Sequence, residues 1–579
     1  MKKFFITTLL NAFFLAVMTA GNTPTHSIYS PVTEPLHEVR AVWLTTIGGI
    51  DWPHSYAQPY QPRSVEVQQR ELCQILDRLV KANINTVIIQ TRIRATTIFP
   101  SDMEPWDGCL SGKPGQSPGY DALAFAIDEC HKRGLKVHAW VVTIPCGKWN
   151  GAGCKNLRKT HPELLKRIGE DGFLNPENPG TADYLARFCG DLASRYDIDG
   201  IHLDYIRYPD TWGKIGNRER GCDNITRIVR AVASEVRECK PWVQMSCSPV
   251  GKYADTKRQW SHGWNARDAV CQDVHLWLKE GLMDAIYPMM YFRNENFYPF
   301  AIDWQERSEG RIVAPGLGIY FMHPREKNWL LTDITRQFHV LRQFGMGNCM
   351  FRSKFFTDNT KGLYNYFADG FASLPALQPA MTWLNDTKPA KPSHVTFTGN
   401  VVSWGEEVKG FNGSRVQDVT YNLYGSDVMP VDVSKAENLL AANLTDRQIN
   451  VGNTGAIRYF AVTATDRYGN ESKPAFSYAT GHEEHPVPSA PTMLPYSNGV
   501  VTLNGTDASA GKLMIVTSAY GNDICSAIVS RYAGNTTIRT GKLSAGLYKV
   551  YTIYKKGHRH LLGYFAVNVD NGENKTIRQ

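Results

Sequence analysis

The sequence lacks several features that would place it in other classes of protein. Beyond residue 21 no stretch approaches about 18 uninterrupted apolar residues, so no membrane-spanning helix is expected in the mature chain. Its basic residues form no run interleaved with aromatics, which argues against nucleic acid as a partner. The 12 cysteines have no repeated spacing, and no cysteine–histidine group has the spacing of a zinc site. We therefore predict neither a metal nor another cofactor.

The chain has ample length and apolar content instead. It contains 579 residues, of which 42% are hydrophobic, and this is too long for a single ordinary domain. Lys and Arg number 63 against 55 Asp and Glu, which leaves a formal net charge of +8 that is diffuse along the chain. A large globular protein of several domains is expected.

Residues 1–21 have the pattern of a secretory signal peptide. Lys2 and Lys3 precede an apolar run over residues 4–17, and small residues ending at Gly21 close it. The run is too short for a comfortable membrane span, and no cysteine near the cleavage point could carry a lipid. We expect an exported protein, secreted or periplasmic, with no integral membrane segment once the signal is removed.

Residues 37–371 alternate between strand-like and helix-like segments. Strands are predicted over residues 39–47, 86–90, 137–144, 200–204, 243–248, 285–291, 313–320 and 348–352. Helical patterns cover residues 65–82, 120–133, 183–196, 223–238, 267–280 and 331–344. Such alternation predicts an α/β fold, the closed parallel (β/α)8 TIM barrel. An open doubly wound sheet is the alternative, but no glycine-rich phosphate turn follows the first strand.

Beyond the barrel the pattern changes to short alternating strands. Residues 372–394 are proline-rich and are expected to form a linker that packs in part on the barrel. Residues 395–485 follow, and within them residues 458–472 resemble the late strands and turn of a fibronectin type III β-sandwich. A proline-bearing break at 486–491 precedes a small C-terminal all-β domain at 492–579. Because barrel and sandwich should have separate cores, the barrel is expected to fold alone.

The segment Asp199–Pro209, DGIHLDYIRYP, is the most informative part of the chain. A short apolar strand there delivers an acid, aromatics and a guanidinium to one rim. His202 and Asp204 are two residues apart, so their side chains share one face, which in a closed barrel is the lumen. Asp204 would then lie at the C-terminal mouth, where barrel enzymes keep their chemistry. An aspartate that only accepts loop amides at a strand end is the alternative.

Four segments resemble the glycosyl hydrolase-like 10 family. They are Glu38–Leu44, Pro100–Trp106, Pro118–Trp140 and Asp199–Pro209, and they span most of the barrel in family order. The resemblance implies a barrel that acts on glycans of the bacterial envelope, with peptidoglycan strands as the expected substrate. It implies nothing about the two C-terminal β domains.

Glycoside hydrolysis usually needs two carboxyls that flank the bond, one ionised and one protonated. Asp204 is the first, and beside His202 and Arg207 it is expected to stay ionised and to stabilise a developing positive charge. The surrounding motif also resembles the chitinase-type strand Asp-Gly-x-Asp-x-Asp-x-Glu. This chain has Ile206 where that strand has its acid glutamate, so the proton donor is expected on another loop.

Glu295, just past the sixth strand, is the leading candidate for the proton donor. To serve, it needs an apolar setting from neighbouring aromatic side chains that raises its pKa. Asp255 after the fifth strand and Asp51 after the first are the rivals. Each of the three could equally be an ordinary solvated loop acid.

Other residues at the rim suit the binding of sugars. Aromatic faces stack on sugar rings, and arginine and histidine can hold hydroxyl, acetamido or carboxylate groups. The candidates are Gln90, Arg92, His138, Trp140, His202, Tyr205, Arg207, Tyr208, Tyr287 and Tyr291. Structural alternatives are barrel filling for Trp140, a satisfied core position for His138 and an ion pair for Arg92. Trp43 is expected to pack the barrel base or first loop rather than contact ligand.

Two functions follow from these observations. The favoured one is an exported glycoside hydrolase that cleaves N-acetylated amino-sugar glycan by carboxylate acid–base chemistry. The alternative is a non-catalytic glycan-binding protein on a degenerate barrel, which the missing strand-four glutamate keeps open.

Overall fold

The computed structural model describes residues 34–405, 419–477, 492–504, 513–518, 523–528, 535–553 and 559–567, apart from positions 214, 453, 456 and 545. The predicted signal peptide and the break at 486–491 lie outside these residues, so both stay predictions. The chain divides into two compact units, of which one is Glu34–Ser489 and the other includes the residues from Ala490 onward.

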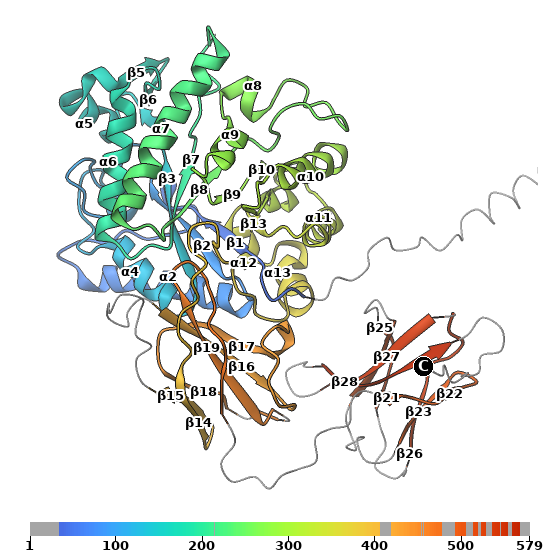
Figure 1. Ribbon diagram of the computed structural model, residues 1–579. Coiled ribbons are helices and arrows are strands. Elements are labelled where there is room, and N and C mark those ends of the chain that lie inside the picture. Colours follow the sequence, from blue (N-terminus) through green and yellow to red (C-terminus); the bar gives the residue numbers. More distant parts are fainter. Residues whose placement is uncertain are drawn as a thin grey trace, which may run out of the picture. The chain divides into compact units, whose positions relative to one another are not determined.

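The first unit contains a closed parallel barrel (Figure 1). Its strands are β1 (Arg40–Leu44), β2 (Thr86–Arg92), β3 (Lys136–Val142), β7 (Gly200–Asp204), β8 (Gln244–Ser248), β9 (Ala285–Ile286) and β10 (Met289–Met290), β11 (Ile312–Val313) and β12 (Gly316–Leu317), and β13 (Asn348–Met350). The sixth and seventh strands are each split in two, at Pro288 and Pro315, because proline has no N–H to donate to a neighbour. Both halves pair in parallel, β9 with β11 and β10 with β12, which closes the ring and confirms the predicted TIM barrel.

Helices cover the outside of the barrel. They are α2 (Pro62–Lys81), α3 (Gly108–Ser111), α4 (Ala122–His131), α6 (Gly180–Arg195), α7 (Arg218–Cys239), α8 (Ala266–Val270), α9 (Val274–Lys279), α10 (Tyr298–Glu306), α11 (Leu331–Gln343), α12 (Ser353–Thr357) and α13 (Leu363–Tyr366). The helix predicted over 267–280 is two helices, because Cys271 between them has a left-handed backbone with φ of 62°. The prediction missed α10 between the sixth and seventh strands.

An insertion after β3 was also missed by the sequence analysis. It contains β4 (Pro145–Lys148), α5 (Ala152–Thr160), β5 (Leu165–Ile168) and β6 (Asp171–Leu174), and its strands form an antiparallel sheet in the order β4-β6-β5. The insertion starts where β3 ends, so it belongs to the C-terminal mouth of the barrel.

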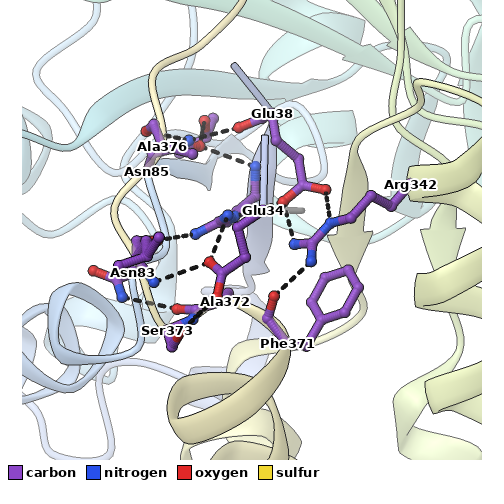
Figure 2. A network of polar contacts seen from close by, with 12 residues as sticks. Glu34, Glu38, Asn83, Asn85, Arg342, Phe371, Ala372, Ser373 and Ala376 are labelled. Atoms are coloured by element: carbon purple, nitrogen blue, oxygen red, sulfur yellow. Dashed lines mark hydrogen bonds and ion pairs between the residues drawn. The ribbon is translucent and has the colours of Figure 1, made fainter. Parts of the chain in front are cut away.

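A buried polar network fixes the start of the barrel (Figure 2). The Glu38 carboxylate accepts hydrogen bonds of 2.7 Å from Arg40 Nε and from Arg342 Nε and Nη2. Asn85 Nδ2 donates to the carbonyl of Glu38 at 2.8 Å and to that of Ala376 at 3.0 Å. The network therefore ties β1 to α11 and to the chain that leaves the barrel.

A β-sandwich follows within the same unit. One antiparallel sheet contains β14 (Ser393–Thr398), β15 (Val401–Gly405) and β18 (Gln448–Asn450), and the other β16 (Val419–Ser426), β17 (Leu439–Leu444), β19 (Tyr459–Asp466) and β20 (Ala475–Ser477). Val402, Trp404, Leu423, Phe460 and Val462 are buried between them. The likeness to a fibronectin type III domain stays a prediction.

Residues 372–394 connect the barrel and the sandwich by direct contacts with both. Leu377 exchanges backbone hydrogen bonds with the N-terminal segment, donating to Leu36 and accepting from Glu38, both at 2.8 Å. Its side chain joins Tyr424 and Leu439 of the sandwich in an apolar cluster. Barrel and sandwich thus have their own cores but also share a third cluster.

The second unit is all-β, as predicted. Its strands are β21 (Thr492–Met493), β22 (Tyr496–Ser497), β23 (Val500–Asn504), β24 (Leu513–Ser518), β25 (Asp523–Ile528), β26 (Asn535–Arg539), β27 (Gly546–Ile553) and β28 (Arg559–Val567). They form sheets in the orders β21-β28-β27-β24-β25 and β22-β23-β26, around a core that includes Val501, Val550 and Phe565. Within the described part of the chain, no helix combines the length and apolar character needed to cross a membrane.

The shared cluster changes the expectation for a truncated barrel. In a chain that ends at residue 386, the free energy of unfolding of the barrel should be about 3–5 kcal/mol smaller than in a chain that ends at 489. The shorter chain lacks the sandwich and therefore exposes side chains such as Leu36 and Leu377. Urea denaturation of the two chains measures this difference. Equal midpoints and equal slopes would show that the barrel needs no support from the sandwich.

Candidate active site

A cavity of about 520 Å³ lies at the C-terminal mouth of the barrel. The ends of β1, β2, β3, β7, β8 and β10 contribute to its wall, together with the insertion after β3. Its aromatic lining is Trp43, Trp140, Phe173, Tyr205, Tyr291 and Phe351, and its polar and charged lining includes Gln90, Arg94, Asp204, Asp210 and Ser248. An aromatic cavity with a few converging polar groups is the usual form of a small-molecule or sugar site.

Asp204 lies at the end of β7 with its carboxylate held by three donors. Trp140 Nε1 donates to Oδ2 at 3.0 Å, and Ser248 Oγ and the Tyr205 amide donate to Oδ1 at 2.8 Å each. Burial raises the pKa of Asp204 above its ordinary value, and these donors and the Arg207 charge oppose that rise only in part. The expectation that Asp204 stays ionised took account of its charged neighbours but not of this burial, and it stays a prediction.

The chain turns sharply after Asp204. Tyr205 has a left-handed backbone with φ of 52°, a conformation that is costly for a residue with a side chain, and its amide faces the carboxylate of Asp204. Tyr205 is 38% exposed, and the centroid of its ring lies 4.5 Å from the Arg207 guanidinium. Both residues were predicted to bind sugar, and the structure places Tyr205 in the cavity wall with Arg207 behind it.

Asp210 is the second carboxyl that lines this cavity, and the sequence analysis missed it. Its side chain is 55% exposed and forms an ion pair with the buried Arg207. The Arg207 charge opposes the rise that burial causes in the pKa of Asp204. Burial raises the pKa of Tyr205, and the charges of Asp204 and Asp210 add to that rise. Two carboxyls therefore lie near one cation and one phenol. The signal available in the sequence was an acid six residues beyond Asp204, directly after the family segment.

Three predicted binding residues lie in the lumen instead of in the cavity wall. His138, His202 and Tyr287 are buried, and the centroid of the Tyr287 ring lies 5.3 Å from that of His202 and 6.5 Å from that of His138. Burial lowers the pKa of His138 to about 4 and that of His202 well below its ordinary value, so both rings are neutral near pH 7. They fill the barrel beneath the cavity.

Trp43 was expected to pack the barrel base or first loop rather than contact ligand, and the structure shows it buried in the barrel with one face on the cavity. Its indole lines the cavity while its Nε1 donates to His202 Nε2 at 3.3 Å. That bond leaves Nδ1 of His202 as the proton-bearing nitrogen, 3.0 Å from Ser246 Oγ. The buried histidine thus supports an aromatic wall of the cavity.

Three other candidates have structural partners. Arg92 is buried and binds both oxygens of Glu104 through Nε, at 2.9 and 2.8 Å. Tyr208 is buried, and its hydroxyl accepts from Asn224 Nδ2 at 3.1 Å. Gln90 lines the cavity, but its Oε1 accepts from the amides of Thr46 and Ile47 and so holds the first loop.

None of the three proposed proton donors lines the cavity. Glu295 is exposed on a short 3-10 helix, Asn294–Asn296, so the expected apolar setting is not met. Asp255 is exposed, and two hydrogen bonds from Ser261 lower its pKa. Asp51 is buried but accepts from Thr45 and forms an ion pair with Arg352.

Comparison with known proteins places the barrel in a family. The model of the family described as glycosyl hydrolase-like 10 matches residues 38–220 and 217–321. The glycosyl hydrolase YngK of Bacillus subtilis (strain 168) is 26% identical over 520 residues, 81% of this chain and 97% of that protein. The glycosyl hydrolase DigH of Escherichia coli (strain K12) is 28% identical over 326 residues, 49% of this chain and 74% of that protein.

Among solved structures, the PgaB (BpsB) glycoside hydrolase domain from Bordetella bronchiseptica is similar at 14% identity. It covers 57% of this chain and 98% of that domain with a TM-score of 0.37, too distant to carry an argument. The family match and the two curated relatives agree with the segments that carry the resemblance in the sequence, and Asp204 and its three donors lie within the matched range. The barrel of this chain belongs to the glycosyl hydrolase-like 10 family.

Proposed function

We propose that the protein is an exported glycoside hydrolase that cleaves N-acetylated amino-sugar glycan, with bacterial peptidoglycan strands as its substrate class. The observation that carries the proposal is the Asp204 carboxyl, held by three donors in an aromatic cavity at the mouth of the barrel. Tryptophan and tyrosine faces suit the apolar faces of sugar rings. The names of YngK and DigH, both glycosyl hydrolases, support the same class of reaction.

Asp204 and Asp210 are the pair of carboxyls that we assign to the reaction. Burial raises the pKa of Asp204, which suits a group that delivers a proton to the leaving oxygen. Asp210 is ion-paired with Arg207 and reaches solvent, which suits a carboxylate that activates the attacking water. Glu295 remains the rival second carboxyl, although its exposed position lends it no support.

A glycan-binding protein without turnover is the second candidate. Ile206, which stands in the place of the strand-four glutamate of chitinase-type barrels, is fully buried and offers no proton. The same aromatic cavity would then hold glycan unchanged. Product analysis separates the two functions.

Asp204→Asn should lower the rate of glycan cleavage by about 10²–10⁴, because the variant can no longer transfer a proton at this position. The measurement is mass analysis of the products from purified glycan strands, with and without stem peptides. Asp223→Asn, a change on the exposed face of α7, is the matched control and should cleave at the wild-type rate. Near-native cleavage by Asp204→Asn would reject the assignment, and no product from the wild type would favour the binding function.

The raised pKa of Asp204 also predicts a pH-dependent stability. Folding disfavours its ionised form, so the contribution of Asp204 to stability is present below its unfolded pKa of about 3.9 and is lost as the pH rises through its higher folded pKa. Asp204→Asn should therefore gain stability relative to the wild type as the pH is raised from about 4 to 7. Urea denaturation along this pH series tests the sign, and a constant difference would contradict it.

Variants at Asp210 and Glu295, the two candidates for the second carboxyl, should differ in activity. Asp210→Ala should lose activity on ordinary glycans and on glycosides with a good leaving group alike, since both need an activated water, and added azide should restore part of it. Glu295→Gln should keep wild-type rates on both. If Glu295→Gln instead lost only the ordinary glycans, Glu295 would be the proton donor and the assignment to Asp204 would fail.

A further inference from the structure

A second cavity adjoins the one that contains Asp204. Its volume is about 310 Å³, and Arg94, Pro145, Gly147, Lys148, Asp171 and Phe173 line it. Arg94, Pro145 and Phe173 line both cavities, so the two spaces adjoin at these three side chains. Both volumes fall within the range of pockets that hold small molecules.

The wall between the two cavities is rigid because the insertion packs directly on the loop after β2. A Cβ atom at Gly153 would overlap the Arg94 carbonyl and come within 2.8 Å of that of Ala95, so only glycine permits this approach. A Cβ atom at Gly147 would lie 2.8 Å from Arg94 Cδ, so the stem of Arg94 rests on the backbone of β4. The insertion therefore packs closely against the backbone and the stem of Arg94.

The chemistry of the second cavity suits a sugar. Pro145 and the largely buried Phe173 offer an apolar surface, and Lys148 and Asp171 form an ion pair of 3.2 Å at the rim. The Arg94 side chain is exposed, and we find for it no ion pair or side-chain hydrogen bond within the described residues. A guanidinium beside an apolar surface can donate to hydroxyl or acetamido oxygens while the ring stacks.

We propose that the second cavity is a subsite for the neighbouring sugar of the same glycan strand. The protein then binds a stretch of polymer across both cavities instead of a single terminal sugar. Arg94 lies at the junction between two sugars. The inference rests on the proposed function, because it takes glycan as the occupant of the first cavity. Because three residues line both spaces, a polymer whose sugars follow one another is the occupant that suits two adjoining cavities.

Binding as a function of chain length tests the subsite. The probes are chitin oligosaccharides from the disaccharide to the hexasaccharide, titrated calorimetrically into the Asp204→Asn protein. Affinity should rise with length and then level off. Adding Arg94→Ala, or Lys148→Ala, which lies in the second cavity alone, should reduce the ratio of long-chain to short-chain affinity about tenfold, or about 1.4 kcal/mol. A loss of affinity in the first cavity alone would affect long and short chains equally, so it would leave this ratio unchanged.

Arg230→Ala is the matched control, because Arg230 is exposed on α7, pairs with Glu280 and lines neither cavity. It should leave the ratio unchanged. Affinity that is flat with length, or no binding of any oligosaccharide, would overturn the inference, as would an equal loss at every length in Arg94→Ala. Length-dependent binding without product from the wild type would keep the subsite and reject the hydrolysis. Product formed with equal kcat/KM at every length would support the hydrolysis and reject the subsite.

Discussion

The ion pairs of the buried Glu38 are the interaction on which the closure of the barrel depends. Burying a carboxylate and two guanidiniums away from water destabilises a fold unless the three groups form ion pairs with one another. Removal of one partner from such a buried cluster lowers the free energy of unfolding by about 3–5 kcal/mol. Glu38, Arg40 and Arg342 meet only when β1 lies between β13 and β2 and α11 packs behind it. The same register delivers Trp43 to the wall of the cavity. The position of the site thus depends on an ion-pair network at the other end of the strand.

Asp204, unlike Glu38, is buried without a cation paired to it in the described part of the chain. Its carboxylate has three neutral donors, but the nearest cation, Arg207, forms its ion pair with Asp210. Burial is therefore compensated only in part, and the pKa of Asp204 stays raised, whereas the charge of Glu38 is matched directly by two guanidiniums. A raised pKa is the direction that the proposed role of Asp204 as proton donor requires. Glu38 thus belongs to an ion-pair network that holds the barrel together, whereas Asp204 is the carboxyl that we propose to react.

The sequence predicted the eight barrel strands because buried parallel strands are continuous apolar runs. It predicted the place of Asp204 from the period of two along β7. That period gives the face of a strand but not how far below the rim a side chain lies. His138 and Tyr287 were therefore taken for rim residues, although they fill the lumen. Aromatic neighbours in sequence suggested an apolar setting for Glu295, yet adjacency does not fix where a loop side chain points, and Glu295 is exposed. Asp210 was missed because an acid on a loop is ordinarily just solvated.

The insertion after β3 was missed for a related physical reason, and this bears on how such a barrel acquires its ligand. Strands β4 and β5 are short and half-exposed, so they lack the apolar run or clean alternation that marks a strand. They pair with β6, and the insertion packs on the loop that carries Arg94 through the close approach of Gly147 and Gly153, which no periodic pattern records. The regular barrel supplies the carboxyl, whereas an irregular segment encloses the adjoining cavity. Selectivity for the length of a glycan would then be set by the part of the chain with the weakest secondary-structure signal.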